Sequence, residues 1–248
     1  MSTVSQAFEL LPWYGWAALA FCALMAGFSK TAIGGLGTFV AVGLAMIFPA
    51  KESTGVALLL FITGDIVAII TYRRNVDWKL LARLVPPVVA GVVLGAVFLS
   101  FVDDAAMKKT LGGIILALSV LSFFPKLLPA DNRAVGYGYG TLAGFTTMVA
   151  NAGGPPMNLY LLALGFDKWK FIATQAWFFF AVNLFKVPFS VGVGILTTNS
   201  LLVALALAPG VLLGTWLGRV LIKRIQQKVF NTVVLILTAV SALYLLVF

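Results

Sequence analysis

The stretch AGFSKTAIGGLG at residues 26–37 is followed much later in the chain by a similar stretch, AGFTTMVANAGGPP, at residues 143–156. Matching glycines of the two halves stand 117 positions apart at Gly27, and 123 positions apart at Gly91. The order of the matches is kept while the separation grows slowly, which is typical of an old internal duplication with small insertions.

We therefore expect residues 1–128 and 129–248 to form two similar repeats of one integral membrane domain, each with five helical elements. In a membrane protein, Gly- and Pro-rich interruptions at matching positions of two repeats point to a transporter. Its binding site is expected where the two interruptions meet.

The composition assigns the chain to the membrane. Hydrophobic residues make up 61% of the sequence and charged residues 10%, and the mean hydropathy is +1.05. Apolar runs close to the ~20 residues that a helical span needs recur along the chain. Alternating strand patterns are absent, so helices rather than a barrel satisfy the backbone. The predicted fold class is all-α, polytopic, with 8–10 transmembrane segments.

Ten apolar segments are expected to be helical. The second and seventh are too short to cross a bilayer comfortably, and two alternatives stay open for them: full crossings, or re-entrant hairpins formed with the segment before each. The segments are 13–31, 35–49, 54–72, 79–101, 106–125, 134–150, 155–166, 171–196, 199–222 and 228–247.

Basic residues set the predicted orientation. Alternating the loops between two faces places twelve Lys or Arg residues on one face and three on the other, and the positive-inside rule makes the richer face cytoplasmic. The richer face holds Arg73, Arg74, Lys79, Arg83, Lys126, Arg133, Lys168, Lys170, Arg219, Lys223, Arg224 and Lys228; the other holds Lys51, Lys108 and Lys109.

Both termini are then expected outside a bacterial-type inner membrane, and the N-terminal tail lacks the features of a cleaved signal peptide. The charged loop at Arg73 and Arg74 falls inside, whereas the uncharged matching loop at residues 197–200 falls outside. This difference indicates that the two repeats are inverted relative to each other. Since the net charge of +9 is explained by these helix-end residues, we expect no nucleic-acid partner.

Four polar residues lie within the predicted apolar segments, where ionised groups are costly and normally face a cavity or a partner. Lys30 at the first interruption is a candidate anion ligand, or else a side chain that snorkels to the surface. Asp65 is a candidate for proton coupling, or else for an ion pair with Lys30 or Lys186. Lys186, beside Asn183 on the same segment, also has a snorkelling alternative.

Small polar side chains and glycines gather at the two interruptions. They are candidates for binding an oxyanion through side-chain donors and exposed backbone N–H groups, but such residues also commonly join one helix to another. The candidates for substrate binding are Lys30, Thr31, Gly34, Gly35, Asn151, Gly153, Gly154, Pro155 and Asn158, with Ser29, Thr146, Thr147 and Gln175 nearby. The pairs Gly91/Gly95 and Gly214/Gly218 are expected to serve helix packing.

Several classes of protein are disfavoured by what the sequence lacks. It has no histidine and one cysteine, so the usual ligands for haem, zinc or an iron–sulfur cluster are missing. It has no Walker-type phosphate loop, and Asp65 is almost the whole supply of intramembrane acids or bases. We therefore expect no enzyme activity, no metal and no cofactor.

The paired AGF…GG stretches, the GGPP run at residues 153–156 and the string FPAKESTG…GDIVAIITYRRNVDW at residues 48–78 resemble the TauE/SafE family of sulfite and organosulfonate exporters. The resemblance covers nearly the whole chain in order. It implies an inner-membrane carrier for small anions, typically sulfite or a sulfonate such as sulfoacetate. It also implies that the substrate region is lined by Gly34, Gly35, Gly153, Gly154 and Pro155.

The first interruption departs from the family's pattern, since Lys30 stands where a small residue is expected. A cation there favours a more strongly charged anion. The leading hypothesis is a secondary transporter that exports a small anion by alternating access between the two repeats, alone or as a homodimer within the lipid bilayer. The alternatives are a passive anion channel and a non-transport scaffold or accessory subunit.

Overall fold

The computed structural model describes residues 12–33, 36–99, 101, 113, 132–192 and 194–247, without the side chains of 50–51 and 241–247. Within these residues all regular structure is helical, which confirms the predicted all-α class. The helices are α2 (Trp13–Thr31), α3 (Leu36–Ala45), α4 (Ala50–Thr71), α5 (Trp78–Leu99), α7 (Arg133–Ala150), α8 (Gly154–Ala163), α9 (Lys168–Gly192), α10 (Thr198–Ile222) and α11 (Gln227–Val247).

These helices coincide with nine of the ten predicted segments to within a few residues; the segment predicted at 106–125 lies outside the described residues. In the described part of the chain, four helices are long and apolar enough to cross a bilayer: Glu52–Thr71 of α4, and α5, α9 and α10. The chain is thus a polytopic membrane protein, while the total number of crossings stays a prediction.

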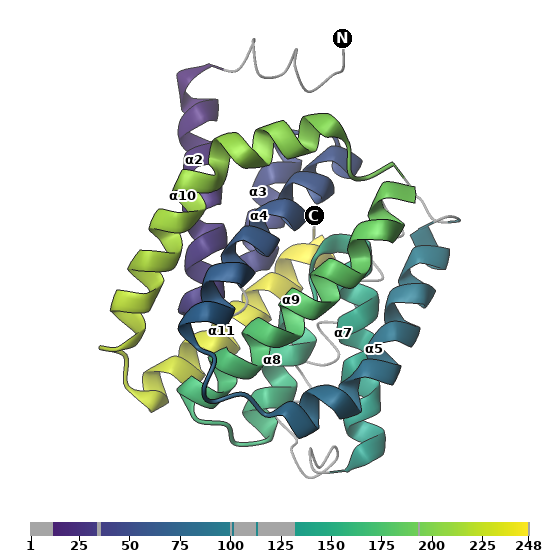
Figure 1. Cartoon of the computed structure of the whole chain (residues 1–248), viewed down its shortest axis with the longest axis vertical. Coiled ribbons are helices and arrows are strands. Elements are labelled where there is room, and N and C mark those ends of the chain that lie inside the picture. The colour runs from purple at the N-terminus through teal and green to yellow at the C-terminus, as the bar shows by residue number, and fades with distance from the viewer. Residues whose placement is uncertain are drawn as a thin grey trace.

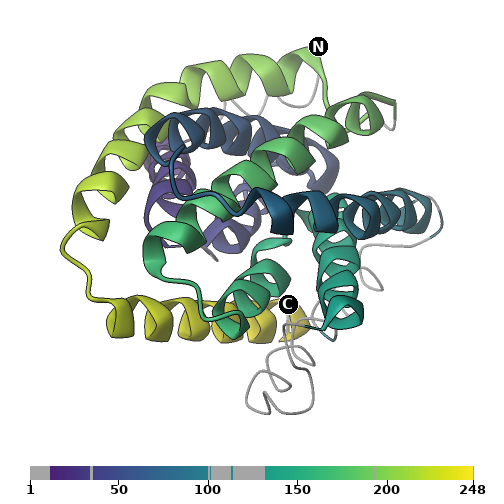
Figure 2. The same cartoon turned by 60° about the horizontal axis from the view of Figure 1, so that its bottom comes forward.

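Helix α9 lies in the middle of the molecule. It contacts α4, α5, α2, α8 and α11, and it runs diagonally across the centre when the lower end of the molecule is turned forward (Figure 2). Helix α10 runs along the outside on the left of Figure 1, and α5 lies beside α7 on the right. Helix α11 forms the lower edge of the view in Figure 2. Helices α4 and α9, which each carry a predicted intramembrane polar residue, therefore face each other in the interior.

Helices α2 and α10 approach closely because each presents a glycine to the other. A Cβ atom on Gly27 would lie 1.9 Å from the carbonyl oxygen of Val211, and one on Gly214 would lie 1.9 Å from that of Leu24. Only a residue without a side chain fits at either point, as is typical of tightly packed membrane helices. We call this contact the α2/α10 seam.

A second seam of the same kind joins α5 to α7. A Cβ on Gly144 would lie 2.3 Å from the carbonyl oxygen of Val88, and one on Gly91 would lie 2.1 Å from that of Thr141. The interpretation of Gly91 and Gly214 as helix-packing residues is confirmed. In both seams, a helix that precedes an interruption packs on a helix from the other half of the sequence.

The two interruptions separate long helices from short ones. Helices α3 and α8 have 10 residues each, which at about 1.5 Å per residue gives roughly 15 Å, half the hydrocarbon thickness of a bilayer. The sequence correctly predicted that these elements are short. Helix α7 ends at Asn151, whose φ of 53° is left-handed, and α8 begins with Pro155 in its first turn, where proline's missing N–H costs nothing.

Candidate functional site

A cavity of about 40 Å³ lies where the ends of α2 and α7 come together between α4 and α9. It draws residues from both halves of the sequence, as the matching interruptions predicted. Its lining combines polar side chains with the rings of Phe61 and Phe179. The lining residues are Ser29, Lys30, Gly37, Thr38, Phe61, Asp65, Thr147, Asn151, Gly154, Gln175, Ala176, Phe179 and Asn183.

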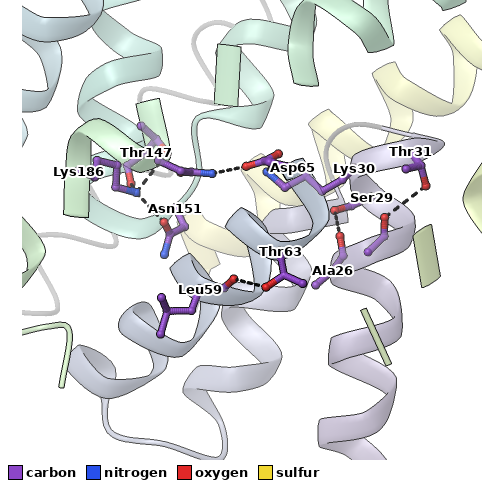
Figure 3. Close-up of polar contacts among 12 residues, drawn as sticks. Ala26, Ser29, Lys30, Thr31, Leu59, Thr63, Asp65, Thr147, Asn151 and Lys186 are labelled. Atoms are coloured by element: carbon purple, nitrogen blue, oxygen red, sulfur yellow. Dashed lines mark hydrogen bonds and ion pairs between the residues drawn. The ribbon is translucent and has the colours of Figure 1, made fainter. Parts of the chain in front are cut away.

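The centre of the site is an ion pair between α2 and α4. Lys30 Nζ lies 2.9 Å from Asp65 Oδ1, and the two side chains are 11% and 0% exposed. The other carboxylate oxygen, Oδ2, accepts a hydrogen bond of 2.7 Å from Asn183 Nδ2 on α9. Lys30 therefore does not snorkel to a surface. Of the two ion pairs predicted for Asp65, the one with Lys30 is present (Figure 3).

Two aromatic rings hold the Lys30 ammonium from opposite helices. Its Nζ lies 4.8 Å from the ring centroid of Phe61 on α4 and 4.8 Å from that of Phe179 on α9. Such cation–π contacts stabilise a cation that has left water. Neither ring was predicted from the sequence, although each lies four residues before a polar candidate, Phe61 before Asp65 and Phe179 before Asn183. Each ring is hence one turn away from that candidate on the same helix face.

Lys186 lies at the second interruption, away from Asp65. Its Nζ donates to the carbonyl oxygen of Thr147 at 2.5 Å and to Asn151 Oδ1 at 2.6 Å, and the residue is only 1% exposed. Carbonyl groups in the last turn of a helix lack intrahelical partners and carry partial negative charge. Lys186 therefore caps the C-terminal end of α7, and its snorkelling alternative does not apply (Figure 3).

Asn151 links this interruption to α4. Its Oδ1 accepts from Lys186, while its Nδ2 donates to the carbonyl oxygen of Thr54 at 3.1 Å. Both polar ends of the amide are thus engaged within the protein. Asn151 lines the cavity, and its left-handed backbone turns the chain from α7 towards α8.

The predicted glycine and proline ligands differ in their positions relative to the cavity. Gly154 lines the cavity, whereas Gly34 and Gly35 lie outside the described residues. Gly153 is adjacent and admits no side chain, because a Cβ there would lie 2.7 Å from the Cβ of Thr147. The next residue in the chain after Gly154, Pro155, is buried and outside the cavity lining.

Two predicted ligands bond to other helices instead of facing the cavity. Thr31 Oγ1 donates to the carbonyl oxygen of Thr215 on α10 at 2.9 Å. The Asn158 amide bonds to Gln175 and to Thr238 on α11, although Gln175 itself lines the cavity. Both residues do the helix-joining work that the sequence left open as an alternative.

At one end of the molecule, Lys170 on α9 pairs with Asp77 just before α5, with Nζ and Oδ2 2.8 Å apart. Burial acts to raise the pKa of the Asp77 carboxyl, but hydrogen bonds from Lys170 and the Leu80 backbone N–H, with the nearby charges of Lys170 and Arg83, lower it below its ordinary value overall. This contact brings together two loops that the positive-inside assignment placed on the same face.

Metal binding finds no support in the described residues, where no cluster of three or more His, Cys, Asp or Glu side chains occurs. The cavity lining thus combines one ammonium group and the carboxylate paired with it with several amide and hydroxyl side chains.

Comparison with known protein families gives one match. The profile of the family described as "Sulfite exporter TauE/SafE" matches residues 19–245. No curated protein and no solved structure matches the chain in these comparisons. The matched range covers almost all of the 248 residues.

The fold is that of a polytopic membrane protein with an enclosed charged centre, and the family match makes it a membrane transporter. The chain belongs to the TauE/SafE sulfite exporter family. Members of this family are transporters rather than enzymes, and they act on small anions across a lipid bilayer.

Proposed function

We propose that the protein is a secondary transporter that moves sulfite or an organosulfonate such as sulfoacetate out of the cell by alternating access. The observation that carries this proposal is the Lys30 ammonium, buried at the wall of a cavity between the two interruptions. A buried cation in a membrane interior with nearby amide and hydroxyl groups fits a small oxyanion. The cavity's volume of about 40 Å³ favours small solutes over extended ones.

An incoming anion competes with Asp65 for Lys30. In the structure, the Asp65 carboxylate pairs with the Lys30 ammonium at 2.9 Å. An oxyanion can therefore pair fully with Lys30 only when Asp65 releases it. Protonation of Asp65 removes its negative charge and frees Lys30. Asn183, which donates to the carboxylate, is then available to a second acceptor. Asp65 is accordingly the residue that would couple a proton to the anion.

The coupling has a measurable energetic consequence. An anion that leaves alone gains about 2.3 kcal/mol per charge at 100 mV from a negative interior. A monovalent anion that leaves with the Asp65 proton carries no net charge, so the membrane potential does not drive it. The response of flux to potential and to a pH gradient therefore separates the two modes.

Alternating access would use the two halves, 1–128 and 129–248, as inverted repeats. The two seams support this. Gly27 and Gly144 are 117 positions apart and their contacts Val211 and Val88 are 123 apart. Gly91 and Gly214 are again 123 apart, and their contacts Thr141 and Leu24 are 117 apart.

Asp65, which pairs with Lys30, and Asn183, which donates to Asp65, follow the same rule. Asp65 and Asn183 are 118 positions apart, as are Phe61 and Phe179. Phe61 and Phe179 both contact the Lys30 ammonium, and Asn183 donates a hydrogen bond to Asp65, the partner of Lys30. A cation placed between equivalent residues of two repeats lies near the axis that relates them, which is where an alternating-access site belongs.

For the cell, we propose an inner-membrane location with the basic end of the molecule in the cytoplasm and both termini outside, following the positive-inside rule. The meeting of Lys170 with Asp77 supports placing these loops on one face. The homodimer stays a prediction from the sequence.

The test is counterflow of labelled sulfite and sulfoacetate in liposomes that contain the purified protein. The variant Lys30→Met/Asp65→Asn removes both charges together and so avoids leaving one buried charge alone. We expect saturable counterflow for the wild type and none for the double variant. Unsaturable flux without counterflow would indicate a channel, and no flux from folded protein would overturn the proposed substrate.

A further inference from the structure

A second, larger pocket of about 610 Å³ lies at the end of the molecule where α4 and α10 finish and α9 begins. Its wall is basic, and it contains no acidic side chain. The lining residues are Ile70, Thr71, Tyr72, Arg73, Arg74, Asn75, Trp169, Ala173, Arg219 and Lys223. We call it the basic pocket.

Among the residues that the structure describes, the cations of the basic pocket have no carboxylate partner. Across the described residues, the ion pairs are Lys30 with Asp65 and Lys170 with Asp77, and neither involves a residue of this pocket. Four like charges from two segments, the residues after α4 and the end of α10, repel one another in the folded protein unless an anion joins them. Three of these are arginines, whose planar guanidinium groups bind oxyanions with paired hydrogen bonds.

The basic pocket is separated from the central cavity by a thin wall. Tyr72 lines the pocket, and its hydroxyl donates a hydrogen bond of 2.7 Å to the carbonyl oxygen of Thr31. Thr31 directly follows Lys30, which lines the cavity. On α9, Ala173 faces the pocket and Gln175 faces the cavity, two positions further along.

The ring of Trp169 completes this wall. Its centroid lies 6.3 Å from that of Tyr72, so one aromatic side chain from α4's end and one from α9's start stand side by side at the pocket's inner limit. Among the described contacts, Tyr72 forms a hydrogen bond to the end of α2, and Trp169 does not. A shift of α2 against α4 would break that hydrogen bond and open the wall.

We propose that the basic pocket is a second binding site for small oxyanions, which loads the central cavity, and that Tyr72 is the gate between the two sites. The loading step rests on the proposed transport function, whereas anion binding in the pocket does not. The pocket concentrates anions at one end of the molecule, and Lys30, which lines the central cavity behind the gate, receives them in turn.

Binding is tested by isothermal titration calorimetry of sodium sulfite into the full chain, in nanodiscs of phosphatidylcholine. The background variant Lys30→Met/Asp65→Asn removes the central site. We expect sulfite to bind this background with an affinity that falls as salt rises. Adding Arg219→Gln/Lys223→Gln should weaken that binding about tenfold or more, because two charged donors are lost.

The matched control is Lys79→Gln/Lys228→Gln, which removes the same charge from two exposed helix-start residues outside the pocket. It should retain most of the affinity. Equal weakening by the control, or no weakening by the pocket variant, would overturn the site. Phosphatidylglycerol provides a second arm: if it replaces sulfite in the pocket, the basic residues bind lipid headgroups and the proposal is wrong.

The gate is tested by counterflow in the otherwise unchanged protein with Tyr72→Phe, which deletes only the hydroxyl. We expect the maximal exchange rate to rise by about two- to tenfold, the factor for one neutral hydrogen bond, with KM little changed. Tyr137→Phe, on an exposed tyrosine of α7, is the control. A rate that stays the same or falls with Tyr72→Phe would overturn the gate.

These outcomes separate the two proposals. Sulfite binding in the basic pocket without wild-type counterflow would reject the transport function and keep the site. Wild-type counterflow with unaltered binding in the pocket variant would keep the function and reject the site.

Discussion

The two interruptions face one cavity but use lysine in opposite ways. At the first, Lys30 belongs to the interrupted helix α2 and reaches across to Asp65 on α4. At the second, Lys186 belongs to α9 and reaches back to the interrupted helix α7, where it binds Thr147 and Asn151. Both ammonium groups are nearly buried, at 11% and 1% exposure.

The difference lies in what each lysine can exchange. Backbone and amide oxygens do not titrate, so Lys186 keeps its partners and fixes the end of α7. The Asp65 carboxylate can take up a proton or be replaced by another anion, so Lys30 can change partner. We infer that the second interruption is structural and the first carries the exchangeable charge.

The largest effect is expected from breaking the Lys30–Asp65 pair on one side only. Lys30→Met leaves a carboxylate buried without its cation, which typically costs about 3–5 kcal/mol. Lys30→Met/Asp65→Asn should recover most of this loss, since no lone charge remains. Thermal unfolding in detergent, followed by tryptophan fluorescence, compares the wild type, Lys30→Met, Asp65→Asn and the double variant as a double-mutant cycle.

Recovery of stability without recovery of counterflow is the expected combination. It would show that the pair's contribution to folding is separable from its contribution to transport. A double variant as unstable as Lys30→Met would contradict this interpretation, because it would mean that the packing of the Lys30 side chain between the two phenylalanines, rather than charge balance, supports the fold.

A smaller loss of stability is expected at the second interruption. Lys186→Met keeps the side-chain volume but leaves Asn151 Oδ1 without its donor, at a cost of about 1–3 kcal/mol for one buried acceptor, whereas the Thr147 carbonyl still accepts from the Asn151 backbone N–H. Leu184→Ala, at an exposed position of the same helix, serves as control. A Lys186→Met protein that is as stable as the wild type but inactive would reverse the roles that we assign to the two lysines.

The two seams provide a comparison in which the halves should respond alike. Gly27→Ala and Gly144→Ala each push a methyl group against a backbone carbonyl, at 1.9 and 2.3 Å before relaxation. Overpacking of this kind costs about 1–3 kcal/mol. Gly138→Ala on α7, with nothing within 4 Å of the added Cβ, should be neutral or stabilising. Strongly unequal losses at Gly27 and Gly144 would argue against equivalent repeats.

The sequence predicted the helices well because the membrane imposes a simple rule. Apolar length and Gly/Pro interruptions located nine described helices, and even the short α3 and α8 were recognised by their length. The pairing of helices was not predicted, since glycines at i and i+4 mark a close contact but do not name the partner. The α2/α10 and α5/α7 seams required the structure.

The site was predicted in part for a similar reason. The rare charges of Lys30 and Asp65 and the polar amide of Asn183 identified these residues within apolar segments, and all three line the cavity. Phe61 and Phe179 were missed because phenylalanine is common in membrane helices and carries no signal of its own. Thr31 and Asn158 were proposed as ligands, yet their side chains turn to other helices, and only three-dimensional contacts distinguish these two uses of a small polar residue.

The smallest effect is expected from the exposed ion pair, which sharpens the contrast with the buried one. Asp77→Asn removes the charge facing Lys170 but keeps an acceptor for the Leu80 N–H at the start of α5, and asparagine caps helices as well as aspartate does. Both side chains are partly exposed, at 39% and 25%, so water and salt weaken their attraction. We expect a loss of at most about 1 kcal/mol.

The pH dependence of this loss follows from the sign of the shift. The folded-state pKa of Asp77 is lowered, so the pair stabilises the fold above the carboxyl's ordinary range, near pH 4, and its contribution disappears as the pH falls through the lowered value. Unfolding of the wild type and Asp77→Asn should therefore differ at neutral pH and converge in acid. A difference that persists in acid would mean that the asparagine alters the cap rather than the charge.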